Sequence, residues 1–306
     1  MSVPALLVLA NSLDGGVSFS YAQPEKVQDL KKSGMSVEEI QMTWTPKVIK
    51  KPWINSTHQL SLQEGDLEVC CYGPEPASEP TLVLLHEGLG CLARWRDFPG
   101  RLANETGIGV LAYSRFGYGR SNLCALPRPL DFMTQEAVEV LPELLAAYGI
   151  QNYSLAGHSD GGSIATIHAS RAKNPDKLIL LAPHFFVEQC CVDAITKARV
   201  LFEREDLADR LGKYHNDVDT AFRGWCDVWL DPDFISGWNI EEDIKSIHCP
   251  VLTIQGDQDI YGTMAQYRSW KEHSNFHQVT MVGCGHDPVA ERTEETLAVM
   301  IDFLQD

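Results

Sequence analysis

The chain has 306 residues, of which 44% are hydrophobic, and a formal net charge of −17 at pH 7. This acidic balance argues against nucleic acid as a partner, because nucleic-acid binding depends largely on Lys and Arg side chains that neutralise phosphates. No apolar run approaches the roughly 18 residues of a membrane span, and no basic residue precedes the short apolar stretch at 4–10, so we expect neither membrane insertion nor export.

Residues 1–55 carry little periodic signal. The stretch 36–40 resembles the start of a helix, whereas 41–53 contains three Lys, two Pro and two Trp without clear periodicity. We interpret residues 1–55 as an N-terminal extension of uncertain structure, which either packs on the core or is partly disordered.

Predicted strands and helices alternate from about residue 58 to the end of the chain. The strands are short, continuously apolar runs, which is typical of a parallel sheet covered on both faces. They are expected at 67–72, 81–86, 108–113, 153–156, 178–181, 251–254 and 278–281, and the helices between them at 98–104, 131–148, 162–172, 263–273 and 291–303. This alternation predicts a doubly wound α/β core formed by residues 56–184 and 246–306.

One interval interrupts the alternation. Roughly 65 residues separate the strand at 178–181 from the strand at 251–254, far more than one crossover connection needs. The interval is rich in aromatic residues, and 192–211 has helical spacing. We predict a mainly helical cap at 185–245, most of whose aromatic side chains form its own small core while a few line a pocket.

The most informative motif is Gly157-His158-Ser159-Asp160-Gly161-Gly162, which follows the strand at 153–156 and precedes a helical stretch. A G-x-S-x-G sequence between a strand and a helix predicts a sharp turn that exposes the serine as a nucleophile. The glycines fit this interpretation, because strained backbone at Ser159 brings its neighbours so close that side chains two residues away would clash.

A serine hydroxyl needs a neighbouring base to remove its proton, and that base needs an orienting acid. Both candidates follow predicted strands. Asp257 and Asp259 come after the strand at 251–254, and His286 comes after the strand at 278–281. The residues alone leave both aspartates open as the acid.

These motifs together resemble the α/β-hydrolase family, in particular its carboxylesterase-like members with a helical cap, over about residues 58–306. The resemblance implies a mostly parallel, doubly wound sheet with a helical cap inserted after the sixth strand. In that family the acid stands three residues after the glycine that closes its strand, which selects Asp259. The resemblance therefore implies a catalytic triad of Ser159, Asp259 and His286.

A tetrahedral intermediate also needs donors for its oxyanion. One is expected to be the backbone N–H of Asp160, the residue after the nucleophile. The resemblance places the other in the loop 86–90, where Glu87 stands in place of the usual glycine after the histidine. This departure leaves the second donor open between Gly88 and Leu89.

Glu87 itself has two possible roles. Its carboxylate either braces the loop, against Arg94 or Arg96, or pairs with a cationic group of a substrate; we favour the brace. The stretch 114–121 resembles a loop that supports the scaffold in the family, with serine replacing the usual aspartate. His158 is expected to pack beneath the nucleophile.

We therefore predict a serine hydrolase that cleaves a small or medium carboxylic ester through an acyl-enzyme, with no metal and no organic cofactor. Alternatives that use the same triad are a lactonase, a carbon–carbon bond hydrolase, an amidase and a cofactor-free haloperoxidase. A different class is a receptor-like ligand-binding protein with little turnover. The nine cysteines are an odd number without zinc-site spacing, and we expect reduced thiols in a cytoplasmic protein. The oligomeric state and the natural ester are not determined by the sequence.

Overall fold

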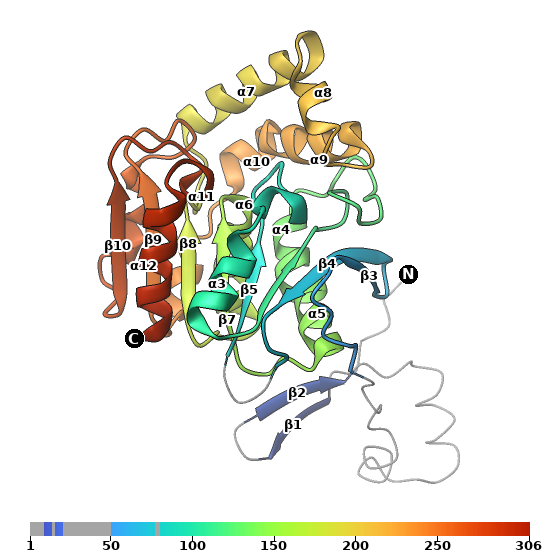
Figure 1. The fold of residues 1–306 in the computed structure, drawn as a ribbon. Coiled ribbons are helices and arrows are strands. Elements are labelled where there is room, and N and C mark those ends of the chain that lie inside the picture. The colour runs from blue at the N-terminus through green and yellow to red at the C-terminus, as the bar shows by residue number, and fades with distance from the viewer. Residues whose placement is uncertain (1–8, 14–15, 21–49, 77–79) are drawn as a thin grey trace. The chain divides into compact units, whose positions relative to one another are not determined.

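The computed structural model describes residues 9–13, 16–20, 50–76 and 80–306 (Figure 1). The chain divides into two units, Met1–Ile49 and Lys50–Asp306. Within the first unit, β1 (Leu9–Leu13) and β2 (Gly16–Ser20) pair as an antiparallel hairpin. The helix start expected at 36–40 lies outside the described residues.

The second unit is built on a twisted sheet whose described strands run in the order β10-β9-β8-β7-β5-β6-β4-β3. All neighbours from β10 to β6 are parallel, whereas β4 is antiparallel to β6 and β3 to β4. The strands are β3 (His58–Ser61), β4 (Asp66–Tyr72), β5 (Thr81–Leu85), β6 (Val110–Tyr113), β7 (Tyr153–His158), β8 (Leu178–Leu181), β9 (Val251–Gly256) and β10 (Phe276–Met281). This topology confirms the predicted fold class.

Helices cover both faces of this sheet (Figure 1). The α-helices of the core are α3 (Phe98–Thr106), α4 (Phe132–Gln135), α5 (Leu141–Tyr148), α6 (Asp160–Arg171), α11 (Pro288–Glu291) and α12 (Thr293–Gln305). A π-helical turn, η2 (Glu136–Val140), joins α4 to α5, and short 3₁₀ segments are η1 (Leu92–Trp95), η3 (Asp243–Ser246) and η4 (Met264–Trp270). The helix expected at 263–273 is therefore a shorter 3₁₀ segment.

The hydrophobic core has two layers, one on each face of the sheet. Along β5, Leu82 and Leu84 pack in a cluster with residues of α3 and α12, while Val83 and Leu85 pack in a cluster with residues of α5 and α6. Successive side chains of a strand point to opposite faces, so a strand buried on both faces must be apolar at every position. The continuous apolar runs in the sequence have this cause.

Four helices occupy the long interval between β8 and β9: α7 (Gln189–Arg204), α8 (Leu207–Leu211), α9 (Val218–Trp229) and α10 (Pro232–Gly237). They lie together above the sheet in Figure 1, and β8 is the sixth of the described strands of this sheet in chain order. Aromatic side chains pack against one another within the group, as where Phe202 and Phe222 stack with ring centroids 3.9 Å apart. None of the helices in the described part of the chain combines the length and apolarity that crossing a membrane requires.

Candidate active site

Ser159 lies in the turn between β7 and α6, with φ 53° and ψ −117°. A positive φ is strained for a residue with a side chain and persists where the surrounding structure enforces it. The flanking glycines allow this turn. A Cβ on Gly157 would lie 2.1 Å from the carbonyl oxygen of Gly161, and a Cβ on Gly161 would lie 2.1 Å from that of Leu85. The glycines of the motif are therefore required by the close approach of backbone segments.

The fold brings the three side chains of the predicted triad together from three separate loops. His286 Nε2 lies 2.9 Å from Ser159 Oγ, and His286 Nδ1 lies 2.8 Å from Asp259 Oδ2. The second oxygen of Asp259 accepts the Tyr261 N–H at 2.8 Å. Asp257, the other candidate acid, instead accepts the Gly283 N–H at 2.7 Å. The ring of His286 can thus accept the serine proton while donating its own Nδ1–H to Asp259.

The electrostatics of the site keep Asp259 charged. Burial alone would raise its pKa, but the hydrogen bond and charge of His286 and the Tyr261 N–H outweigh burial, so the pKa of Asp259 lies below its usual range. The ring of His184 lies 5.7 Å from that of His286. Burial and the neighbouring His286 lower the pKa of His184 to about 3, so His184 is neutral and adds no competing positive charge.

Three backbone N–H groups are candidates for binding an oxyanion. Asp160 is the first residue of α6, and Gly88 and Leu89 lie in the loop after β5. Among the backbone–backbone hydrogen bonds of the described loops and turns, none is donated by the N–H of Gly88, Leu89 or Asp160. Gly88 and Leu89 therefore both stay candidates for the second oxyanion donor, beside Asp160.

One buried arginine holds the loop that carries Gly88. Arg115 is 1% exposed and donates through Nη1 to the His86 carbonyl and through Nη2 to the Glu87 carbonyl, the latter at 3.1 Å. The same Nη2 lies 3.8 Å from Asp160 Oδ2, so one guanidinium connects the two halves of the candidate oxyanion hole. Sequence analysis assigned the loop of Arg115 only a supporting role. The available signal was its position directly after a strand, at the same edge of the sheet as Ser159.

The Glu87 carboxylate is paired within the protein. Its carboxylate lies 3.6 Å from Arg94 Nε and 3.8 Å from His158 Nδ1, while His158 Nε2 donates to the His286 carbonyl at 2.8 Å. Burial disfavours charge on both Glu87 and His158, but the attraction between the two charged groups outweighs this cost of burial. It holds the pKa of Glu87 well below its usual range and, with Asp287, raises the pKa of His158 to about 9. Arg94 and His158 thus provide the brace favoured for Glu87.

Sequence analysis did not single out Trp229, which connects α9 to the nucleophile turn. Its Nε1–H donates to Asp160 Oδ1 at 3.0 Å. The Asp160 side chain is fully buried, and burial raises its pKa against the opposing effect of Arg115. Because 69 residues separate the two partners, no local pattern in the sequence signals this contact.

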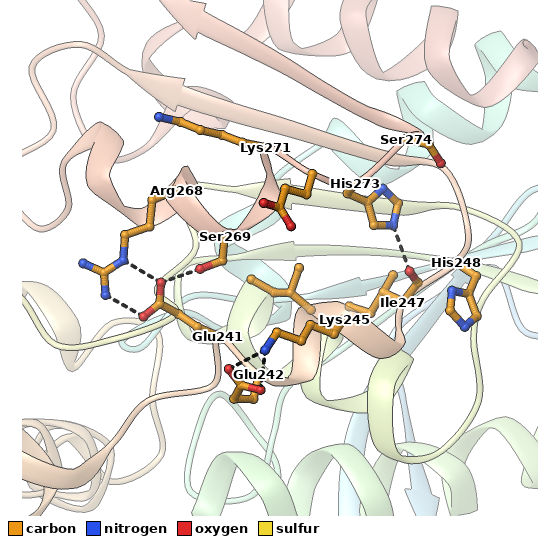
Figure 2. A pocket seen from close by; sticks show the side chains of 12 residues that line it. Glu241, Glu242, Lys245, Ile247, His248, Arg268, Ser269, Lys271, His273 and Ser274 are labelled. Carbon is orange, nitrogen blue, oxygen red and sulfur yellow. Dashed lines mark hydrogen bonds and ion pairs between the residues drawn. The ribbon is translucent and has the colours of Figure 1, made fainter.

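A groove of about 800 Å³ lies elsewhere on the surface, lined by residues of the stretches 241–248 and 268–274 (Figure 2). Four of its charged side chains form two pairs, Arg268 Nε to Glu241 Oε1 at 2.6 Å and Lys245 Nζ to Glu242 Oε2 at 2.7 Å. None of the three residues of the predicted triad lines it. Within the described residues, no cluster of three or more His, Cys, Asp or Glu side chains is arranged to hold a metal ion.

The fold and the nucleophile turn define a hydrolase of the α/β class. The family model described as the alpha/beta hydrolase family matches residues 82–299, and the chain belongs to this family. Among curated proteins it is similar to a proline iminopeptidase of Lactobacillus delbrueckii subsp. bulgaricus, with 20% identity over 269 residues that cover 75% of this chain and 91% of the relative.

Solved structures show the same fold. The enol-lactonase from Burkholderia xenovorans superposes with a TM-score of 0.65 at 21% identity, covering 81% of this chain and 100% of that one. A structure from a study of carboxylesterases of the thaumarchaeon Nitrososphaera gargenis gives a TM-score of 0.66 at 19% identity, with 81% and 98% covered. At these identities the likeness extends to the fold and not to the substrate.

Proposed function

We propose that this hydrolase cleaves a small or medium carboxylic ester through an acyl-enzyme on Ser159. The observation that carries the proposal is the hydrogen-bonded series from Ser159 Oγ through His286 to Asp259, with distances of 2.9 and 2.8 Å. A serine hydroxyl bonded to an imidazole that is itself oriented by a carboxylate is the arrangement that activates serine for acyl transfer.

The reaction follows from this geometry. Ser159 Oγ attacks the ester carbonyl while His286 Nε2 takes the hydroxyl proton, and the resulting oxyanion accepts hydrogen bonds from the Asp160 N–H and from Gly88 or Leu89. Collapse of the intermediate expels the alkoxide, which leaves as the alcohol after His286 returns the proton. Water, deprotonated by His286, then attacks the acyl-enzyme and releases the carboxylic acid and free Ser159.

The charges near Ser159 favour a neutral ester over a substrate with a free amine. A cationic amine would need an available carboxylate, but Glu87 is paired with Arg94 and His158, and Asp160 is held by Arg115 and Trp229. We further infer that α7–α10 act as a cap over the site, because Trp229 of α9 contacts the residue next to the nucleophile.

The test is hydrolysis of p-nitrophenyl acetate and butyrate at pH 8 by the wild-type protein and by Ser159→Ala, side by side. We expect turnover by the wild type and its loss in the variant. A simple lactone and proline p-nitroanilide, assayed in parallel, compare ester cleavage with lactone and amide cleavage. A folded wild type that leaves every ester intact, or an ester activity that survives in Ser159→Ala, contradicts the proposal.

A further inference from the structure

The indole of Trp225 reaches the oxyanion loop from α9. A Cβ on Gly88 would lie 2.2 Å from Trp225 Nε1 and 2.4 Å from Cδ1, so the nitrogen-bearing edge of the ring lies against the Gly88 backbone. A side chain at position 88 would occupy the same space as the indole. The glycine is therefore needed for the approach of a side chain that lies 137 residues away in the sequence.

Trp225 and Trp229 are one turn apart on α9, and side chains four residues apart share a helix face. The two rings meet different halves of the candidate oxyanion hole. Trp229 Nε1 donates to the Asp160 carboxylate at 3.0 Å, beside the first N–H donor. Trp225 Nε1 lies beside Gly88, a candidate for the second.

The two indole N–H groups differ in what they bind. Trp225 is 7% exposed as a whole residue, and within the described residues its Nε1 is not among the fully enclosed indole nitrogens without a partner, which are those of Trp95 and Trp270. Its Nε1–H therefore keeps access to solvent, and an indole N–H at such a place can donate to an acceptor that enters from outside. The ring is held in place by Phe222, at a centroid distance of 5.9 Å, which stacks in turn on Phe202. The ring is therefore packed in place while its N–H stays available to an acceptor that enters the site.

Resting on the proposed acyl transfer at Ser159, we propose that Trp225 is a catalytic residue whose indole N–H donates to the substrate carbonyl oxygen beside the Gly88 N–H. The bond strengthens as that oxygen gains negative charge in the tetrahedral intermediate. Trp225 thereby makes the cap part of the oxyanion hole, because the donor reaches the carbonyl only when α9 lies on the loop after β5. Donors fixed before the reaction stabilise such charge without the cost of reorganisation.

The test compares Trp225→Phe with the wild type in p-nitrophenyl butyrate hydrolysis. Phenylalanine keeps an aromatic ring but removes the N–H. Because removing one oxyanion donor costs about 10²–10³-fold in turnover, we expect kcat and kcat/KM to fall together, by at least about tenfold for this supplementary donor. Trp53→Phe is the matched control, since Trp53 packs on Tyr148 and donates to the Gly73 carbonyl, and its activity should remain that of the wild type.

A second readout is independent of turnover. Butylboronic acid adds to the serine to form a tetrahedral adduct with an oxygen in the oxyanion position, so its affinity should fall in Trp225→Phe by a factor similar to that of kcat/KM. Wild-type activity or affinity in Trp225→Phe, or a rise in KM alone, overturns the inference. If Trp225→Phe does not fold, 3-benzothienylalanine at position 225 replaces the N–H with sulfur in a ring of the same shape.

The boronic acid also separates this inference from the proposed ester function. If the wild type binds it through Ser159, and more tightly than Trp225→Phe, but cleaves no ester, the ester function fails while the Trp225 donor stands. Boronic acid binding that is absent, or unchanged in Ser159→Ala, refutes the inference together with the nucleophilic role of Ser159.

Discussion

His158 connects the two loops that carry the candidate catalytic base and the candidate oxyanion donors. Its Nε2–H donates to the backbone carbonyl of His286 at 2.8 Å, and its Nδ1 lies 3.8 Å from Glu87 Oε2. The ring is buried, and the carboxylates of Glu87 and Asp287 more than offset the cost of burying its charge, so the pKa of His158 rises to about 9. A protonated ring donates from both nitrogens, which is the form that fits both contacts.

Replacing His158 should change how stability depends on pH. A pKa of about 9 in the folded protein lies above the 6.5 of an unperturbed histidine, so the folded state binds this proton more tightly. The stabilisation is complete below pH 6.5 and is lost as the pH rises to about 9. We expect His158→Gln to be less stable than the wild type at pH 6 and to lose less stability between pH 6.5 and 9.

Urea unfolding at several pH values between 6 and 9.5 measures this difference. The matched control is His277→Gln, because His277 is exposed on β10, and its pH dependence should follow that of the wild type. Parallel curves for His158→Gln and the wild type would exclude a charged His158 in the folded protein.

Asp259→Asn should reduce turnover far more than Asp257→Asn. Only Asp259 holds the Nδ1 of His286, and an amide in its place favours the wrong tautomer of the ring. We expect kcat to fall by about 10⁴-fold in Asp259→Asn. Asp257→Asn keeps an oxygen acceptor for the Gly283 N–H and should remain within about threefold of the wild type. Equal losses in the two variants, measured by kcat on p-nitrophenyl acetate, contradict the assignment of the acid.

Gly157→Ala should disturb both stability and catalysis. The added Cβ would lie 2.1 Å from the backbone oxygen of Gly161, and backbone cannot rotate away as a side chain can. We expect a loss of about 1–3 kcal/mol in the free energy of unfolding, together with lower kcat from displacement of Ser159. Gly237→Ala is the control, because nothing lies within 4 Å of its added Cβ, and it should change stability by less than about 0.5 kcal/mol. A Gly157→Ala protein as stable and active as Gly237→Ala would show that the turn is not tightly packed.

Short acyl chains should be preferred. Ser159 is only 7% exposed, and Trp229 of α9 bonds the neighbouring Asp160, so we expect a long acyl chain to meet the side chains of α9. We expect kcat/KM to be highest for p-nitrophenyl acetate or butyrate and to fall on the order of tenfold for the octanoate. A kcat/KM that increases steadily with chain length contradicts this closed arrangement and indicates an apolar channel that opens with the substrate.

Local patterns predicted most of the core elements to within a few residues. The apolar runs at 178–181 and 251–254 correspond to β8 and β9, because strands buried on both faces exclude polar residues throughout. The strand β3 was not identified individually. Only Leu60 of its four residues is buried, so its short sequence lacks that pattern. The 3₁₀ segment η4 was expected as a longer helix, since a short helical periodicity does not distinguish the two conformations.

The sequence by itself determined the strained turn at Ser159 and the order in which the candidate acid and base follow it. The turn depends on steric contacts between residues that are neighbours in the sequence. The acid and the base lie near Ser159 because the loops that follow parallel strands all lie at the same edge of the sheet. The residues alone left Asp257 and Asp259 open, the family resemblance selected Asp259, and the tertiary structure brings Asp259 to His286. Only the tertiary structure shows that Arg115 and Trp225 meet the oxyanion loop. Those contacts join residues far apart in the chain. They depend on the order of the strands in the sheet and on how α9 packs against the core, and the periodicity of the sequence specifies neither.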